Sequence, residues 1–90
     1  MQVGDLVIAT AGKEKNEIFL VVKVDQQFVY IADGKRVSVT KPKRKNEKHI
    51  QKVSKQRFLL GDDITRDVKY NSAVRKLIKV EKERICQKKM

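Results

Sequence analysis

The segment at residues 17–24, EIFLVVKV, is the feature that most limits what this chain can fold into. Its β-branched and aromatic residues favour a strand, in which alternate side chains point to opposite faces. Apolar residues occupy both faces, with Ile18, Leu20, Val22 and Val24 on one and Phe19 and Val21 on the other. Because such a strand has to be buried on both sides, the segment predicts a strongly curved sheet that is partly covered by another part of the chain.

Three more short strands are expected, at residues 5–11, 28–33 and 36–41. The connections between the strands, GKEKN, DQQ and DGK, are tight, as in hairpins. Asp33 and Gly34 are a strong signal for a two-residue hairpin turn, because both central positions of that turn need a positive φ. The sequence therefore predicts a mainly β fold in which four short antiparallel strands follow one another in a meander and form a small barrel.

The C-terminal part is expected to be a helix that runs from Asn71 or Ser72, both good N-caps, to about Gln87. Apolar residues recur at helical spacing along one stripe, interrupted by Glu81, and they are Tyr70, Val74, Leu77, Ile78 and Ile85. A neighbouring face is basic and carries Arg75, Lys79 and Lys82. Since amphipathic helices in small domains usually cover their own core, we expect a barrel at residues 1–60 and a turn with a covering basic helix at residues 61–90.

The length and composition fit one small globular domain. The chain has 90 residues, of which 40% are hydrophobic, enough for one modest core. No apolar run approaches the roughly 18 residues of a membrane span, and the N-terminus lacks the basic region of a signal peptide. Cys86 is the one cysteine of the sequence, so no internal disulfide is expected. These features predict a cytoplasmic protein without a membrane segment.

The positive charge is concentrated beyond residue 40, within a formal net charge of +11. Residues 1–40 carry five basic and five acidic side chains, residues 41–60 carry eight and one, and residues 61–90 carry nine and five. A neutral part followed by a basic part suggests a directed electric field. The commonest polyanionic partner of such a field is nucleic acid.

Residues 41–49 hold the densest group of cations, which are Lys41, Lys43, Arg44, Lys45 and Lys48. These cations repel one another, and bound phosphates remove that repulsion while releasing counterions. Pro42 restricts Lys41 to extended geometry, so the segment is interpreted as an extended basic arm and not as a recognition helix. A solvated loop and a localisation signal of the PKRK kind are the alternative interpretations.

The segment VGDLVIATAGKEKNEIFLVVKVD, with Gly12 in its hairpin loop, resembles the KOW motif of several ribosomal proteins and transcription factors. The continuation YIADGKRVSVTKPKRKNEKH is similar to small stand-alone bacterial KOW proteins related to the archaeal and eukaryotic large-subunit ribosomal protein L-fourteen-e. The resemblance covers roughly residues 2–52 and implies an SH3-like β-barrel that binds RNA, in particular ribosomal RNA. Family members often have a second glycine where this chain has Asn16, and asparagine is the other residue that best tolerates a positive φ.

Three groups of residues are candidates for RNA contact. The hairpin loop at residues 12–16 contributes Gly12, Lys13, Lys15 and Asn16. Lys35 and Arg36 follow the Asp33–Gly34 turn, where they either extend the basic surface or protect a strand edge against aggregation. The basic arm contributes Lys41, Lys43, Arg44, Lys45, Lys48 and His49. Because His49 has no Cys or second His as a metal-binding partner, it either contacts RNA or anchors the arm where the chain rejoins the core at Ile50.

The expected function is that of a non-catalytic RNA-binding protein associated with the ribosome and translation, with RNA and then ribosomal proteins as partners. The sequence has no Gly-rich phosphate loop, no paired His/Cys or Ser/His group and no metal-ligand cluster, so no catalysis, cofactor, metal or small-molecule substrate is expected. Phe28 and Tyr30 are expected to pack in the core, with base stacking as the alternative. Aromatic residues are scarce in the sequence, which favours shape recognition of structured RNA over base stacking. A small-barrel DNA-binding protein and an SH3-like protein-interaction module remain as alternatives.

Overall fold

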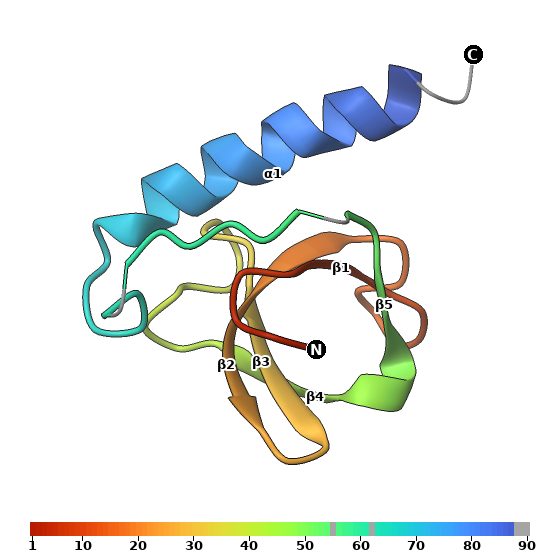
Figure 1. Cartoon of the computed structure of the whole chain (residues 1–90), viewed down its shortest axis with the longest axis horizontal. Helices are drawn as coiled ribbons and strands as arrows, with labels where there is room; N and C mark the ends of the chain where they lie inside the picture. Colours follow the sequence, from red (N-terminus) through yellow and green to blue (C-terminus); the bar gives the residue numbers. More distant parts are fainter. Residues whose placement is uncertain (55, 62, 88–90) are drawn as a thin grey trace.

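The computed structural model describes residues 1–54, 56–61 and 63–87, with side chains as far as residue 84. This part of the chain contains five strands, one 3₁₀ helix and one α-helix (Figure 1). They are β1 (Leu6–Ala9), β2 (Ile18–Asp25), β3 (Phe28–Ala32), β4 (Lys43–Asn46), η1 (Glu47–His49), β5 (Ile50–Lys52) and α1 (Tyr70–Gln87). The fold is mainly β with a C-terminal helix, which confirms the predicted fold class at this level.

All five strands belong to one antiparallel sheet with the order β4-β3-β2-β1-β5. In the central strand β2, Leu20 lies opposite Leu6 of β1 and opposite Ala32 of β3. A bulge between Val21 and Lys23 interrupts the pairing of β2 with β3 and increases the local bend. The sheet is not closed into a ring of paired strands, but it curves strongly, and the short η1 connects its two edge strands, β4 and β5 (Figure 1).

Both faces of this sheet are buried, as the double-sided apolar pattern of β2 predicted. Phe19 and Val21 belong to one core cluster, together with Val7, Ala9, Val29, Ile31 and Ile50. Ile18, Leu20 and Val22 belong to a second cluster, together with Leu6, Ala32, Val39, Ile64 and Val74. Val24, at the far end of the strand, is exposed. A sheet with two apolar faces must be covered on its outer face by another part of the chain. The second cluster includes residues from outside the strands, Val39, Ile64 and Val74, that cover this face.

Helix α1 is that cover. Val74 is fully buried, and Tyr70, Leu77 and Ile78 pack against the second cluster, so the predicted helix and its apolar stripe are confirmed over the described side chains. Ile85 and Cys86 have side chains outside the described residues. Neither Asn71 nor Ser72 is the N-cap that we predicted, because the helix already begins at Tyr70 and both residues lie inside it.

The side chain of Asn71 instead fixes the start of α1 to the preceding loop of the sheet. Its Oδ1 accepts a hydrogen bond from the N–H of Val39 (2.8 Å), and its Nδ2 donates one to Ser38 Oγ (3.0 Å). Val39 is itself fully buried. The first turn of the helix and the loop after β3 are therefore held together by both polar and apolar contacts.

The predicted strand at residues 36–41 and the two-residue hairpin before it are wrong. The carboxylate of Asp33 accepts hydrogen bonds from the N–H groups of Lys35 (2.9 Å) and Val37 (2.8 Å), and the carbonyl of Val37 accepts from Asp33 and Gly34. Such side-chain bonds offer the backbone an alternative to a sheet ladder. Gly34 has a positive φ of 75°, whereas Asp33 does not, so residues 33–37 form a compact turn and leave the sheet.

The fourth strand lies later in the sequence, inside the segment that we predicted as a basic arm. Lys43–Asn46 pairs with β3 as β4, so this part of the arm is extended as predicted but belongs to the sheet. The three-residue strand β5, which was not predicted, pairs with β1. Beyond it, residues 57–61 form a loop from which Phe58 and Leu60 pack against the second cluster.

Candidate nucleic-acid interface

The hairpin loop at residues 12–16 has the left-handed geometry that its sequence indicates. Gly12 has a φ of 86° and Asn16 a φ of 73°, so asparagine occupies a conformation that usually requires glycine. The N–H of Asn16 donates to the carbonyl of Ala9 (2.8 Å), and the N–H of Lys15 donates to the carbonyl of Gly12 (3.2 Å). This tight loop presents Lys13 and Lys15 as exposed side chains.

The conformation of Asn16 yields a stability prediction. We expect Asn16→Gly to change the free energy of unfolding by less than about 0.5 kcal/mol, because the relief of left-handed strain offsets the greater freedom of glycine in the unfolded chain. Asn16→Val is expected to cost about 1–2 kcal/mol, because a β-branched residue is strained at this φ. Urea unfolding of the two variants and the wild type measures both values, and a valine variant as stable as the wild type would contradict the prediction.

Glu14 joins the hairpin loop to strand β4. Its carboxylate forms ion pairs with the Nζ atoms of Lys43 and Lys45, the second at 3.4 Å. Glu14 and Lys45 are mostly buried, with side-chain exposures of 17% and 16%. A Cβ on Gly12 would lie 3.5 Å from Lys45 Nζ, so the side chain of this lysine reaches the loop. The hairpin loop and β4, far apart in sequence, therefore form one continuous surface.

Arg44, between these two lysines, lies over an aromatic ring. Its guanidinium carbon is 4.8 Å from the ring centroid of Phe28, and Lys23 Nζ is 5.3 Å from that of Tyr30. Tyr30 packs against the second core cluster, as predicted, whereas Phe28 is half-buried and belongs to neither cluster. A cation therefore lies over one face of each ring, which reduces the aromatic surface that is open for base stacking.

The rest of the predicted arm lies directly before and after β4 in the sequence. Lys41, Lys48 and His49 are exposed, and Ile50 beside them is buried. The N–H of Thr10 donates to the carbonyl of His49 (2.9 Å), so the backbone at His49 connects η1 to the start of the loop region. We call the hairpin loop, Lys41, β4 and η1 together the loop–strand surface.

Several cations of the loop–strand surface have no acidic partner within the described parts of the chain. These are Lys13, Lys15, Lys41 and Lys48. Each is exposed and ends in a point charge on a flexible stem. The surface is therefore electropositive even though Glu14 balances part of the charge on β4.

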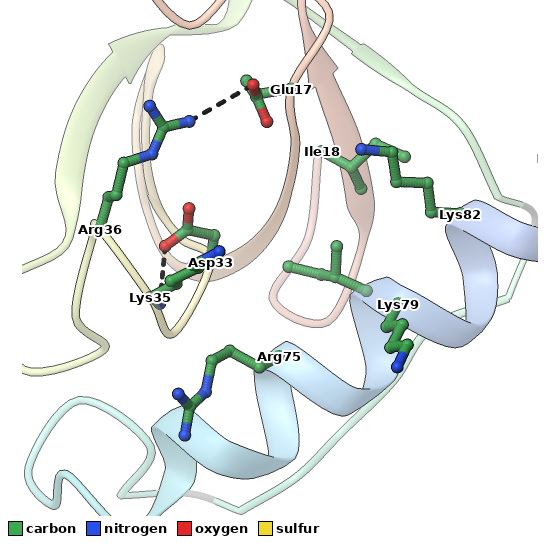
Figure 2. A pocket seen from close by; sticks show the side chains of 9 residues that line it. Glu17, Ile18, Asp33, Lys35, Arg36, Arg75, Lys79 and Lys82 are labelled. Atoms are coloured by element: carbon green, nitrogen blue, oxygen red, sulfur yellow. Dashed lines mark hydrogen bonds and ion pairs between the residues drawn. The ribbon is translucent and has the colours of Figure 1, made fainter.

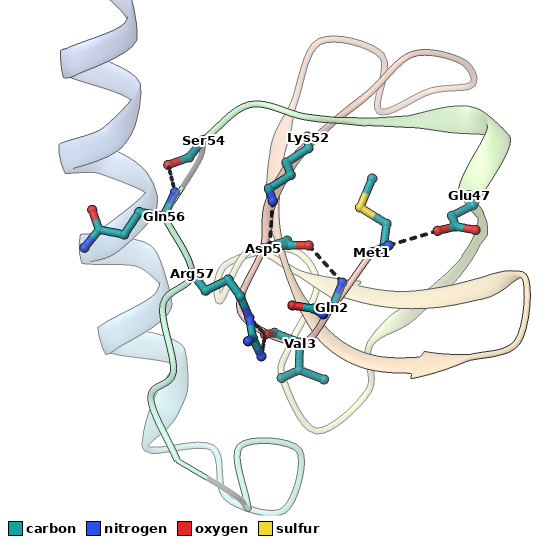
Figure 3. A network of polar contacts seen from close by, with 9 residues as sticks. All are labelled: Met1, Gln2, Val3, Asp5, Glu47, Lys52, Ser54, Gln56 and Arg57. Atoms are coloured by element: carbon teal, nitrogen blue, oxygen red, sulfur yellow. Dashed lines mark hydrogen bonds and ion pairs between the residues drawn. The ribbon is translucent and has the colours of Figure 1, made fainter.

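A polar network on the N-terminal side engages other cations in ion pairs and hydrogen bonds (Figure 3). The amino group of Met1 lies 3.1 Å from Glu47, and Lys52 Nζ lies 3.6 Å from the buried carboxylate of Asp5. Arg57 donates two hydrogen bonds to the carbonyl of Val3, both 3.2 Å long. These basic residues hold the N-terminal segment in place, so they are not counted in the interface.

Lys35 and Arg36 lie in the turn at residues 33–37 and not on a strand, which rules out the strand-edge role. Arg36 forms an exposed ion pair with Glu17 (3.3 Å). Asp33 and Arg36 help to line a hollow of about 300 Å³ together with Lys13 and Glu14 of the hairpin loop. The turn is therefore a neighbour of the loop–strand surface.

The same turn forms one wall of a larger groove of about 750 Å³, whose other wall is α1 (Figure 2). We call it the helix groove, and its lining consists of Glu17, Ile18, Asp33, Lys35, Arg36, Arg75, Ile78, Lys79 and Lys82. The candidate site derived from the sequence omitted Arg75, Lys79 and Lys82. Their common helix face was visible in the sequence, but their position opposite Lys35 and Arg36 depends on how α1 packs.

Among the described residues, no cluster of three or more His, Cys, Asp or Glu side chains is arranged to hold a metal ion. Nor does any helix there combine the length and the apolar character of a membrane span. No protein-family model matches the sequence, and no curated protein matches it significantly.

Proposed function

We propose that this chain is a non-catalytic RNA-binding protein that binds the phosphate backbone of structured RNA through its loop–strand surface. The observation that carries the proposal is the junction made by Glu14, which fixes the hairpin loop against β4. Among the described residues, exposed lysines without acidic partners flank Glu14 in the hairpin loop and flank β4 in the sequence. Phosphates are the ligands that relieve the repulsion among such cations.

The chemistry of the surface favours contacts to the backbone over contacts to bases. Lysine ammonium groups act as point charges on phosphate oxygens, which position a nucleic acid without reading its sequence. Base stacking needs open aromatic faces, and Arg44 and Lys23 each occupy one face, of Phe28 and Tyr30 respectively. A firmly folded loop and strand suit the recognition of the shape of a folded RNA.

We further propose that the fold is an SH3-like small barrel of the KOW type, related to the L-fourteen-e family. The strongly curved sheet with two buried faces supports this assignment, as do the positive φ values at Gly12 and Asn16, where KOW relatives often have glycines. The relationship makes ribosomal RNA the first candidate ligand, with a cytoplasmic, ribosome-associated role in translation and ribosomal proteins as neighbours.

The test replaces cations of the hairpin loop without touching the core. We expect Lys13→Gln/Lys15→Gln to bind a ribosomal RNA fragment about 5- to 30-fold more weakly than the wild type, if each lost contact is worth about 0.5–1 kcal/mol. The matched control is Arg66→Gln/Lys76→Gln, which removes the same charge from exposed positions outside the loop–strand surface. Fluorescence anisotropy measures the affinities.

Two results would count against this proposal. If the loop variant and the control lose the same RNA affinity, binding depends only on the net charge of the protein and not on the loop–strand surface. Equal affinity of the wild type for RNA and for duplex DNA of the same length would favour the DNA-binding alternative, since only RNA has the 2′-hydroxyl groups.

A further inference from the structure

The helix groove carries cations on both walls, supplied by segments that are distant in sequence (Figure 2). The turn at residues 33–37 contributes Lys35 and Arg36, and α1 contributes Arg75, Lys79 and Lys82. The acidic residues of the lining are Glu17 and Asp33. The carboxylate of Asp33 accepts hydrogen bonds from backbone N–H groups of its own turn. With five basic side chains against these two carboxylates, the lining has a formal net charge of +3, so the groove is electropositive.

Most of these cations have no acidic partner in the part of the chain that the structure describes. Within the described residues, Lys35, Arg75, Lys79 and Lys82 form no ion pair. The pair between Arg36 and Glu17 is exposed, with side-chain exposures of 68% and 44%, and such pairs are weak and screened by salt. The cations of α1 are also spaced so that they share one side of the helix and repel one another. An anion in the groove would relieve this repulsion.

The two walls are held in a fixed relation, so the groove exists before any ligand binds. A Cβ on Gly34 would lie 2.2 Å from the backbone oxygen of Asn71 and 3.1 Å from Cγ of Arg75, so the turn touches the first turns of α1. The hydrogen bonds of Asn71 to Val39 and Ser38 secure the same contact. Binding in the groove therefore needs no rearrangement of the backbone, and the ordering cost is limited to the side chains.

The groove also continues into the loop–strand surface. Asp33 and Arg36 line both the helix groove and the smaller hollow that contains Lys13 and Glu14. A ligand that binds both the helix groove and the loop–strand surface therefore lies next to Arg36. Along α1, Arg75 and Lys82 are seven residues apart, which corresponds to about 10 Å of helix at about 1.5 Å per residue. That length exceeds a single phosphate group and suits successive phosphates of one strand.

We propose that the helix groove binds the phosphodiester backbone of the same RNA molecule that contacts the loop–strand surface, with Arg36 at the junction. The inference rests on the proposed RNA-binding function and extends it, because it makes α1 a binding element as well as the cover of the core. Lys35, Arg75, Lys79 and Lys82 contact phosphates, and Arg36 exchanges its pairing with Glu17 for a phosphate.

The experiment compares Lys79→Gln/Lys82→Gln with the matched control Arg66→Gln/Lys76→Gln. Both variants lose the same charge at exposed positions, and Arg66 and Lys76 do not line the groove. Binding of a folded ribosomal RNA fragment is measured over a salt series, after thermal melting has verified that both variants fold. We expect the groove variant to bind about 5- to 30-fold more weakly, with a salt slope reduced in magnitude by about 1.5, and the control to stay within about twofold of the wild type.

The outcomes separate this inference from the proposed function. If the wild type binds RNA and Lys13→Gln/Lys15→Gln weakens binding while the groove variant matches the control, the inference is overturned and the proposed function stands. If the wild type binds no RNA, both fail. A parallel arm uses phosphatidylserine vesicles. If the groove variant loses vesicle binding while its RNA affinity is unchanged, the groove is a membrane contact and the inference is also overturned.

Discussion

Gly34→Ala is expected to lower the free energy of unfolding by about 3–5 kcal/mol, an unusually large loss for the addition of one methyl group. Gly34 has a φ of 75°, a conformation that strains any residue with a Cβ. The new Cβ would also lie 2.2 Å from the carbonyl oxygen and 3.0 Å from the carbonyl carbon of Asn71. These are backbone atoms of α1, so the clash is relieved only by moving the helix away from the turn and disturbing the burial of Val74.

Gly12→Ala is the matched control, because it adds the same methyl group at a similar φ of 86°. Among the described residues, a Cβ there would meet Lys45 Nζ at 3.5 Å and Glu14 Oε2 at 3.6 Å, which are ordinary contacts with the ends of flexible side chains. Its expected cost is therefore the conformational strain alone, about 1–2 kcal/mol. Urea unfolding followed by circular dichroism gives both values. Equal losses in the two variants would show that the contact between Gly34 and α1 contributes little to stability.

The burial of both faces of the sheet was predictable, because a single strand carries apolar side chains on both of its faces. Residues 18–22 are apolar at every position, and no solvent-facing strand tolerates that pattern. The helix was also predictable from one segment alone, because Val74, Leu77 and Ile78 recur at the spacing of one helix face. The left-handed positions in the hairpin loop followed from the residue types, glycine and asparagine, at Gly12 and Asn16.

The errors concern segments whose structure depends on distant partners. Residues 36–41 have the alternation of a strand, but the carboxylate of Asp33 turns the chain, and Val39 is buried through its contacts with α1 instead. The sequence KRKN of β4 has little intrinsic preference for a strand. This segment forms a strand because it can pair with the free edge of β3 and because Glu14 of the hairpin loop forms ion pairs with Lys43 and Lys45.

The same distinction applies to the candidate site. Exposed cations such as Lys13, Lys15 and Lys48 could be chosen from charge and motif alone. The ion pairs of Glu14 with Lys43 and Lys45 of β4 could not be predicted in this way. These pairs reduce the number of unpaired positive charges on the predicted arm. The basic face of α1 was recognised in the sequence, but only the packing of the helix places Lys79 and Lys82 in one groove with Arg36.

Raising the salt concentration from about 50 to about 200 mM is expected to weaken RNA binding by about 60- to 1,000-fold. This range corresponds to a protein that neutralises about four to six phosphates, which gives a slope of log affinity against log salt of about −3 to −5. The exposed lysines of the loop–strand surface and the cations of the helix groove are sufficient for this number. Anisotropy titrations at four or more salt concentrations measure the slope.

The comparison of ligands separates recognition of RNA from attraction to any polyanion. Ribosomal RNA fragments, unrelated RNA hairpins and duplex DNA of equal length are titrated over the same salt range. If the folded loop and strand recognise RNA shape, structured RNA binds more tightly than DNA, and the excess persists as salt rises, because shape-specific contacts release few counterions. The excess should shrink when accessible 2′-hydroxyl groups are replaced by hydrogen. Parallel lines without an offset between RNA and DNA would contradict RNA recognition and leave a surface that attracts any polyanion.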